Sequence, residues 1–199
     1  MYSSSFDKFI ITQNQAIVLR IKAGQEKRKI DQHAKYILLH SAIAFNVSSW
    51  DAYINNIVRE FIVKIQDISI NKYSNLHHLV SNNADLSLKR FNTPNHENTR
   101  TVLLKCTGYD PYPDWIWSRK GWSGLQTREF LNEILKVRHS FAHGFPMPHF
   151  EWNTDASGNP FLSCSILKII EYFFRNLVKK TDRGLKQFML INYNTNLWA

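Results

Sequence analysis

An arginine and two histidines lie within six consecutive positions of this chain, at Arg138, His139 and His143. A guanidinium keeps its positive charge and presents a planar set of N–H donors that matches two phosphate oxygens. An imidazole titrates near neutral pH, so it can give or take a proton during a reaction. Together, these residue types suit chemistry at a phosphate group.

The segment that carries them, residues 121–146, predicts a core-facing helix. Apolar side chains recur there at three- and four-residue steps; they are Leu131, Ile134, Leu135, Phe141 and Ala142. Gly144 and Pro146 are a stop signal for this helix. Arg138 follows Ile134 by four positions, so the pattern places Arg138 on the apolar stripe, where an unpaired charge is costly. We therefore expect its guanidinium to have a partner.

Asp51 is a candidate for that partner. A long helix is expected from a cap at Asp31 to about Ser69, and Asp51 interrupts its apolar pattern. A carboxylate in such a place must be hydrogen-bonded or ion-paired if it is buried. Either Asp51 lies on an exposed face of this helix, or it orients Arg138 or a histidine. The pattern alone leaves both readings open.

The motif resembles the signature of the HEPN family, and most closely its RiboL-PSP-HEPN branch. That branch typically reads R-[NHD]-x-[IF]-A-H-G, and this chain reads RHSFAHG. The matching residues are Arg138, His139, Phe141, Ala142, His143 and Gly144. A weaker match is Trp50-Asp51-Ala52-Tyr53.

The resemblance implies a metal-independent endoribonuclease that cleaves RNA through attack of its 2′-OH group. In such enzymes the site is composite, built between the two protomers of a homodimer. Arg138 would hold the scissile phosphate and His143 would act as general acid or base, with His139 and Asp51 in support. The resemblance also implies a toxin or anti-phage effector, with an antitoxin or defence-system protein as a further partner. The alternative is a catalytically inactive HEPN module that binds RNA or a partner protein.

The spacing of Arg138 and His143 bears on the dimer. On a continuous helix, at about 100° per residue, they would lie about 140° apart around the axis. They converge within one chain only if the helix ends before His143, as Gly144 suggests. A two-fold axis beside the helix end would then place two such pairs around one cleft, an arrangement that the resemblance implies and that the spacing alone does not prove. A simpler alternative is that Arg138 and His143 only stabilise the end of the helix.

A zinc site is the main rival interpretation. His139 and His143 have the i, i+4 spacing that can bind zinc from one helix face. Ser140 stands where the H-E-x-x-H pattern has glutamate, and only His149 or Asp155 could add a ligand nearby. We therefore expect neither a metal nor a cofactor.

One position departs from a related pattern. In HEPN toxins paired with a nucleotidyltransferase antitoxin, the motif continues as H-x-Y, and the tyrosine can be adenylylated. This chain has Phe145 at that position, which lacks a hydroxyl group. Control by that modification is not expected here.

Composition predicts one domain, residues 1–199, with a polyanionic partner. The chain has 199 residues, 44% of them hydrophobic, and a formal net charge of +9. A charge of this sign favours nucleic acid. The basic pairs Arg119–Lys120 and Lys179–Lys180 are the expected RNA contacts. Trp and Tyr side chains near Arg119 could stack on bases, or could simply anchor their loop to the core.

Cysteine usage and hydropathy point to the cytoplasm. Cys106 and Cys164 are isolated and lack metal-type spacing, which fits reduced thiols. No apolar run approaches the roughly 20 residues that span a bilayer. The N-terminal stretch lacks the basic and apolar regions of a secretion signal. We expect a cytoplasmic protein without a membrane partner.

The remaining pattern predicts an all-α, HEPN-like bundle of four to five main helices. Helices are expected at about residues 6–24, 31–69, 72–91, 94–105, 121–143 and from 160 to 177 or beyond, with a polar turn QEKRK at 25–29. Residues 146–161 contain FEWN followed by the turn signal DASGN, which predicts a short irregular or β-hairpin insert after the motif helix.

Overall fold

The computed structural model describes residues 1–25, 31–66 and 74–198 of the chain. These residues form six α-helices: α1 (Ser4–Gln25), α2 (Gln32–Lys64), α3 (Ser74–Lys89), α4 (His96–Thr107), α5 (Gly124–His143) and α6 (Cys164–Tyr193). Two 3₁₀ turns, η3 (Ser118–Lys120) and η4 (Glu151–Asn153), lie in the connections. The described residues contain no β-strand, so the expected all-α class and helical bundle are confirmed.

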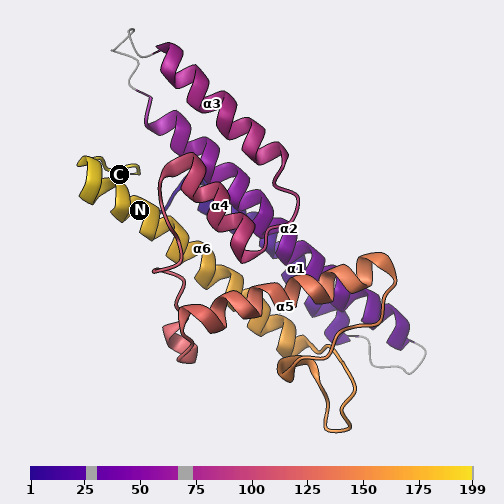
Figure 1. Ribbon diagram of the computed structural model, residues 1–199. Coiled ribbons are helices and arrows are strands. Elements are labelled where there is room, and N and C mark those ends of the chain that lie inside the picture. The colour runs from indigo at the N-terminus through magenta and orange to yellow at the C-terminus, as the bar shows by residue number, and fades with distance from the viewer. Residues whose placement is uncertain (26–30, 67–73, 199) are drawn as a thin grey trace.

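The bundle is built around α2, which is 33 residues long, and α6, which is 30. Figure 1 shows α3 beside the C-terminal half of α2, and α5 crossing the bundle nearer the N-terminal half of α2. The core between the helices contains fully buried aromatic side chains, among them Trp50, Tyr53, Trp115, Phe173 and Phe174. Burial of such large apolar side chains dominates the stability of a domain of this size.

Local signals account for most helix boundaries. Ser123 and Gln126 form a reciprocal capping box at the start of α5. Asn95 caps α4 by accepting a hydrogen bond from the Asn98 N–H, and Gly108 ends α4 in the left-handed conformation. Asp31 precedes α2 as expected, but its side chain makes no capping hydrogen bond.

Two expected helix ends differ from the structure. α2 ends at Lys64, and the expected end near Ser69 lies outside the described residues, as does most of the QEKRK turn. α6 begins at Cys164, after the expected start near Pro160, and continues past Leu177 to Tyr193. Its apolar residues Leu185 and Met189 are buried, so the same core-facing stripe extends the helix.

The insert after α5 is irregular rather than a β-hairpin. It contains η4 and a single isolated bridge between Thr154 and Pro160. Asn153 is fully buried and organises the turn: its Nδ2 donates to the Pro148 carbonyl at 3.0 Å. The Trp152 indole N–H also donates to the Glu133 carboxylate of α5 at 2.9 Å. The insert is therefore fastened to the helix that carries the motif.

Candidate active site

Aromatic packing fixes the N-terminal half of α5 against the bundle. The Phe130 ring lies 4.9 Å from Phe173 of α6, 5.0 Å from Trp122 and 5.4 Å from Trp152, each edge to face. Edge-to-face pairs at these distances are favourable beyond the area that they bury. The end of α5 that carries the motif packs on α2, where the Phe141 ring lies 4.5 Å from the His40 ring.

α5 continues through His143 and ends in a Schellman motif. Gly144 is left-handed, with φ 68°, and its N–H donates to the Phe141 carbonyl at 3.4 Å. The Phe145 N–H donates to the Ser140 carbonyl at 2.8 Å. The expectation that the helix stops before His143 is wrong. Arg138 and His143 of one chain therefore stay about 140° apart around the helix axis.

His139 and His143 form a pair on one face of α5. Their ring centroids are 4.2 Å apart with an interplanar angle of 44°, and both side chains are exposed. Phe145 lies beside them, with its ring 5.9 Å from His143 and 6.1 Å from His139. Neither imidazole makes a hydrogen bond to any residue that the structure describes. Both rings are thus free to meet a ligand.

Arg138 lies outside the apolar stripe, contrary to expectation. The stripe continues from Ile134 through Val137, three positions on, and leaves Arg138 exposed. Within the described parts of the chain, no hydrogen bond and no ion pair under 4 Å holds its guanidinium. Buried residues on an amphipathic helix recur every three or four positions. After Ile134 the next buried residue comes three positions later, at Val137.

The charge of Arg138 nevertheless affects the pKa of Asp51 on α2. Burial raises the pKa of Asp51 above its ordinary value, and the positive charge of Arg138 opposes that rise. Asp51 is half-buried, and its Oδ1 accepts a long hydrogen bond, 3.4 Å, from Asn55. The carboxylate thus lies close enough to act on the guanidinium through its charge, without forming an ion pair.

The neighbours of Asp51 have structural roles. The Trp50 indole N–H donates to the Pro94 carbonyl at 3.0 Å and so fixes the loop before α4. The Tyr53 hydroxyl lies 3.3 Å from the Asp182 carboxylate of α6, inside the core. In the segment Trp50-Asp51-Ala52-Tyr53, therefore, Trp50 and Tyr53 make hydrogen bonds that hold the bundle together. Asp51 interacts with Arg138 through its charge.

The segment that carries the first basic pair is attached to the helix that carries the second. The segment before Arg119 packs on α6: Trp115 donates to the Thr181 hydroxyl at 2.9 Å, next to Lys180. Lys179 is exposed and Lys180 half-buried, whereas η3 exposes Arg119 and Lys120. η3 precedes α5, whose 20 residues span about 30 Å, so both pairs are remote from His143 of the same chain.

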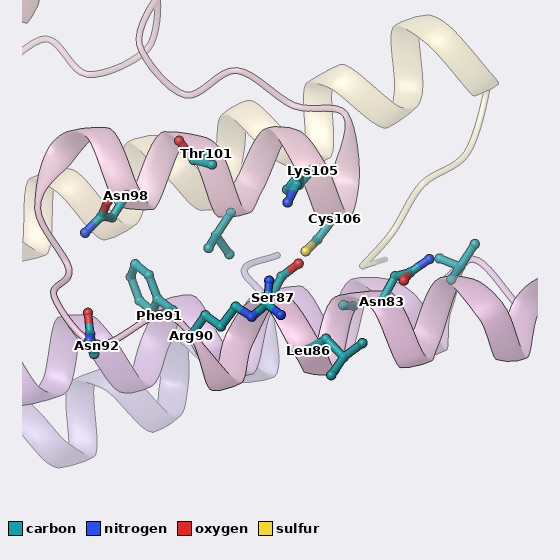
Figure 2. Close-up of a pocket in the computed structure, with 13 residues that line it drawn as sticks. Asn83, Leu86, Ser87, Arg90, Phe91, Asn92, Asn98, Thr101, Lys105 and Cys106 are labelled. Atoms are coloured by element: carbon teal, nitrogen blue, oxygen red, sulfur yellow. The ribbon is translucent and has the colours of Figure 1, made fainter.

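Two cavities differ in their relation to the motif. One, of about 480 Å³, lies along α5 and includes His139 in its lining. Another, of about 620 Å³, lies between α3 and α4, where Figure 2 shows Asn83, Arg90 and Lys105. No motif residue lines the second cavity. The cavity along α5 is therefore the one adjacent to the motif histidines.

Sequence reasoning missed two residues of α5, Asn132 and Lys136, which line the cavity beside His139. A signal is present in the sequence, because positions 132, 136, 139 and 143 follow one another by four, three and four residues. That spacing puts them on one helix face. Periodicity of apolar side chains alone does not reveal a polar face of this kind.

His40 of α2 was also missed. It is 2% exposed, and neither ring nitrogen has a hydrogen-bond partner among the described residues. Its ring stacks on Phe141 of α5 at 4.5 Å and lies 4.2 Å from the Tyr36 ring. Burial lowers the pKa of His40 to about 4. Nothing in the local sequence distinguishes this histidine from an exposed one.

No group of three or more His, Cys, Asp and Glu side chains that could hold a metal ion occurs among the described residues. His149 is exposed, and Asp155 is engaged in a turn, accepting from the N–H groups of Ser157 and Asn159. None of the helices that the structure describes is both long and apolar enough to cross a membrane.

Comparison with known proteins gives one match. The model of a protein family described as RiboL-PSP-HEPN matches residues 10–187, a range that includes Asp51, Arg138 and His143. No curated protein matches the chain, and no solved structure does.

Proposed function

The chain belongs to the RiboL-PSP-HEPN family, and from that premise we propose that it is a metal-independent endoribonuclease that works as a homodimer. Family membership by itself indicates a nuclease or RNA-related function. The observation that carries the finer proposal is the end of α5, which presents an unpaired guanidinium and two unpaired imidazoles to solvent. A purely structural role would tie these side chains to the bundle.

The proposed reaction is an internal transesterification of RNA. The 2′-OH oxygen attacks the adjacent phosphorus, the bond from phosphorus to the 5′-oxygen breaks, and a 2′,3′-cyclic phosphate forms. His143 of one protomer takes the 2′-OH proton, and an imidazole of the other protomer gives a proton to the leaving oxygen. Arg138 binds the phosphate oxygens and stabilises the charge that develops on them. Asp51 positions Arg138 through its charge.

The angle between the two residues supports the proposed dimer. Arg138 and His143 of one chain lie about 140° apart around α5, so one chain alone does not direct both at the same phosphate. Apolar surface suitable for a partner lies near the motif: Tyr36 and Ile37 of α2 are 45% and 41% exposed. Tyr36 is also 6.2 Å from the Phe141 ring of α5. A second copy on this surface would bring a second motif close to the first.

The biological role that fits best is a cytoplasmic toxin or anti-phage effector restrained by a partner protein. Uncontrolled RNA cleavage harms the cell that makes the enzyme, so an antitoxin or a trigger is expected. This part of the proposal rests on the family. The net charge of +9 supports RNA as the substrate.

An RNA degradation assay tests the proposal against its alternative, an inactive HEPN module. Purified protein is incubated with single-stranded RNA in excess EDTA, and the ends of the products are identified by mass spectrometry. The proposal expects cleavage with 2′,3′-cyclic phosphate ends. An absolute requirement for a divalent cation would reject the mechanism. Binding without cleavage would favour the inactive module.

A further inference from the structure

The cavity of about 620 Å³ lies where α3 packs loosely on α4. α3 has 16 residues, of which only Ala84 and Leu88 are buried, whereas the shorter α4 buries four of its 12 residues. Small side chains face the gap, among them Ala84 on α3 and Thr101 and Cys106 on α4. Small side chains leave space between two helices that larger ones would fill. The volume lies within the roughly 300–1,000 Å³ of small-molecule sites.

Two positive charges in this cavity lack a counter-ion. Figure 2 shows Arg90, just after α3, and Lys105 of α4 extending into the space between the two helices. Both side chains are exposed, and neither has an ion pair or a hydrogen bond within the described ranges of the chain. The described lining includes no Asp or Glu, because Asp85 of α3 lies 3.6 Å from Arg59 of α2 instead. The cavity therefore favours an anion.

Polar side chains in the lining are already fixed in place. The Asn98 side chain donates to the Thr93 carbonyl at 3.0 Å, and the Asn98 N–H donates to the Asn95 side chain at 2.7 Å. Burial raises the pKa of the Cys106 thiol, and a hydrogen bond with Ser87 opposes that rise. Figure 2 shows this sulfur beside the Ser87 hydroxyl, where α3 and α4 are linked. A preformed pocket spares a ligand the cost of ordering its walls.

Apolar side chains cover another part of the lining. Phe91 and Val102 are only 8% and 7% exposed, and Val80 is half-buried. A phosphate ion alone would leave this apolar surface and most of the volume unfilled. A ligand that joins a phosphate to a planar, partly apolar group would use both the cations and the apolar surface.

We propose that this cavity binds a nucleoside 5′-phosphate. Arg90 and Lys105 bind the phosphate, and the planar guanidinium can donate to two of its oxygens. The base lies against the apolar surface at Phe91, and the sugar hydroxyls meet the Asn98 amide and the Thr101 hydroxyl. The nucleotide is not the substrate of the motif, because no motif residue lines the cavity. Since it contacts both helices, it should hold α3 against α4.

The test is a calorimetric titration of the purified full chain with 5′-AMP, 5′-GMP, 5′-CMP and 5′-UMP. The four nucleosides and inorganic phosphate are titrated in parallel, because each carries one part of the proposed ligand. At least one monophosphate should bind with a dissociation constant below about 1 mM, and about tenfold or more tightly than its nucleoside or phosphate. Absence of binding by all four would overturn the proposal. Inorganic phosphate that binds as tightly as every nucleotide would also overturn it.

Arg90→Gln and Lys105→Gln each remove one charge from the lining. Each should weaken binding of the nucleotide about tenfold or more, the loss expected for a hydrogen bond to a charged group. Lys89→Gln is the matched control, because Lys89 is an exposed cation next to Arg90 that does not line the cavity. It should bind the nucleotide as the wild type does. An equal effect of all three glutamine variants would indicate attraction by net charge alone and reject the site.

Thr101→Trp tests the cavity without a change of charge. Thr101 is an exposed lining residue of α4, so the variant should fold, and its indole should occupy the cavity and prevent binding. Unchanged binding would reject the site. In the wild type, bound nucleotide should slow amide hydrogen exchange in α3, because it holds this helix against α4. Exchange in α3 that does not respond to bound nucleotide would also contradict the proposal.

The motif is a second place where a nucleotide could bind, and Arg138→Ala tests it. This variant should bind the nucleotide as the wild type does. If Arg138→Ala abolishes binding and Arg90→Gln does not, the nucleotide binds at the motif, which rejects the cavity but leaves the proposed function standing. Nucleotide binding that depends on Arg90, in a protein that never cleaves RNA, would retain the cavity and reject the catalysis.

Discussion

The imidazole rings of His139 and His143 lie 4.2 Å apart, centroid to centroid, on one exposed face of α5. Arg138 precedes His139 by one residue and lies on a different side of the helix, and its charge opposes the rise in the pKa of Asp51 on α2. In the proposed mechanism, each protomer therefore presents its proton-transfer groups and its phosphate-binding group on different sides of α5. Cleavage of RNA should need both kinds of group.

Removing the His143 imidazole or the Arg138 guanidinium should abolish most RNA cleavage. We expect His143→Ala and Arg138→Ala each to lower kcat/KM by about 10²–10⁴-fold, the usual contribution of a positioned acid or base. Both side chains are exposed, so the variants should unfold at the wild-type temperature. His149→Ala, an exposed histidine outside the motif, is the control and should retain full activity. Decreases of tenfold or less would argue against a catalytic role.

Replacing Asp51 should lower the activity of the protein without lowering its unfolding temperature. Burial raises the pKa of Asp51, so the ionised carboxylate costs the folded protein stability, and this cost appears as pH rises from the ordinary pKa towards the raised one. Asp51→Asn should therefore unfold at the same or a higher temperature at pH 7, an advantage that disappears below about pH 4. Activity should fall roughly tenfold to a hundredfold because Arg138 loses its opposite charge. A lower unfolding temperature would make Asp51 a structural residue.

The buried His40 should make the protein sensitive to mild acid. Its pKa is lowered to about 4 in the folded state, against about 6.5 when unfolded, so the unfolded state binds more protons between these values. Stability should be fully present above pH 6.5 and decline as pH falls towards 4, by on the order of 3 kcal/mol.

His40→Leu should flatten that decline, as measured by urea unfolding at several pH values. Tyr36→Leu, which alters a neighbour of His40 but keeps the imidazole, is the control and should keep the wild-type pH dependence. An unchanged slope in His40→Leu would assign the acid sensitivity to other groups.

Charge reversal at the basic pairs tests which part of the surface binds RNA. Charge reversal at Arg119 and Lys120, or at Lys179 and Lys180, should weaken binding of long RNA. It should also reduce the salt dependence of that binding, by about one unit of slope for each phosphate that the protein no longer neutralises. Cleavage of a short oligonucleotide should change little, because these residues are remote from the motif.

Charge reversal at the exposed Lys89 and Arg90, at the end of α3, is the control for the basic pairs and should leave RNA binding close to that of the wild type. Affinity that does not depend on salt would instead favour a protein partner over RNA.

The active unit should be a dimer. Sedimentation should give twice the 23.4 kDa chain mass at assay concentrations, with an interface that buries on the order of 2,000 Å². Ile37→Glu, at an exposed apolar position of α2, should shift the protein towards monomers and lower its activity. A monomer with full activity would reject the composite site.

Complementation tests the composite site directly. Arg138→Ala and His143→Ala proteins are each inactive in the proposal, but their heterodimers keep one intact arginine and one intact histidine on different chains. Mixing the two proteins should recover part of the activity. If no activity returns, each protomer must use its own pair.

Local chemistry in the sequence determined much of the fold. Gly144 ends its helix as predicted, and the RHSFAHG motif identified the family, because caps and short motifs depend on neighbouring residues. The all-α class followed from hydrophobic periodicity for the same reason.

Only the tertiary structure decided how the site is arranged. The sequence could not choose between Val137 and Arg138 as the next core residue, because both steps are compatible with a helix. Packing against the rest of the bundle made that choice, exposed Arg138 and set Asp51 near it. The burial of His40 and the unpaired Asn132 Oδ1 likewise depend on elements distant in the chain, whose contacts no local pattern encodes.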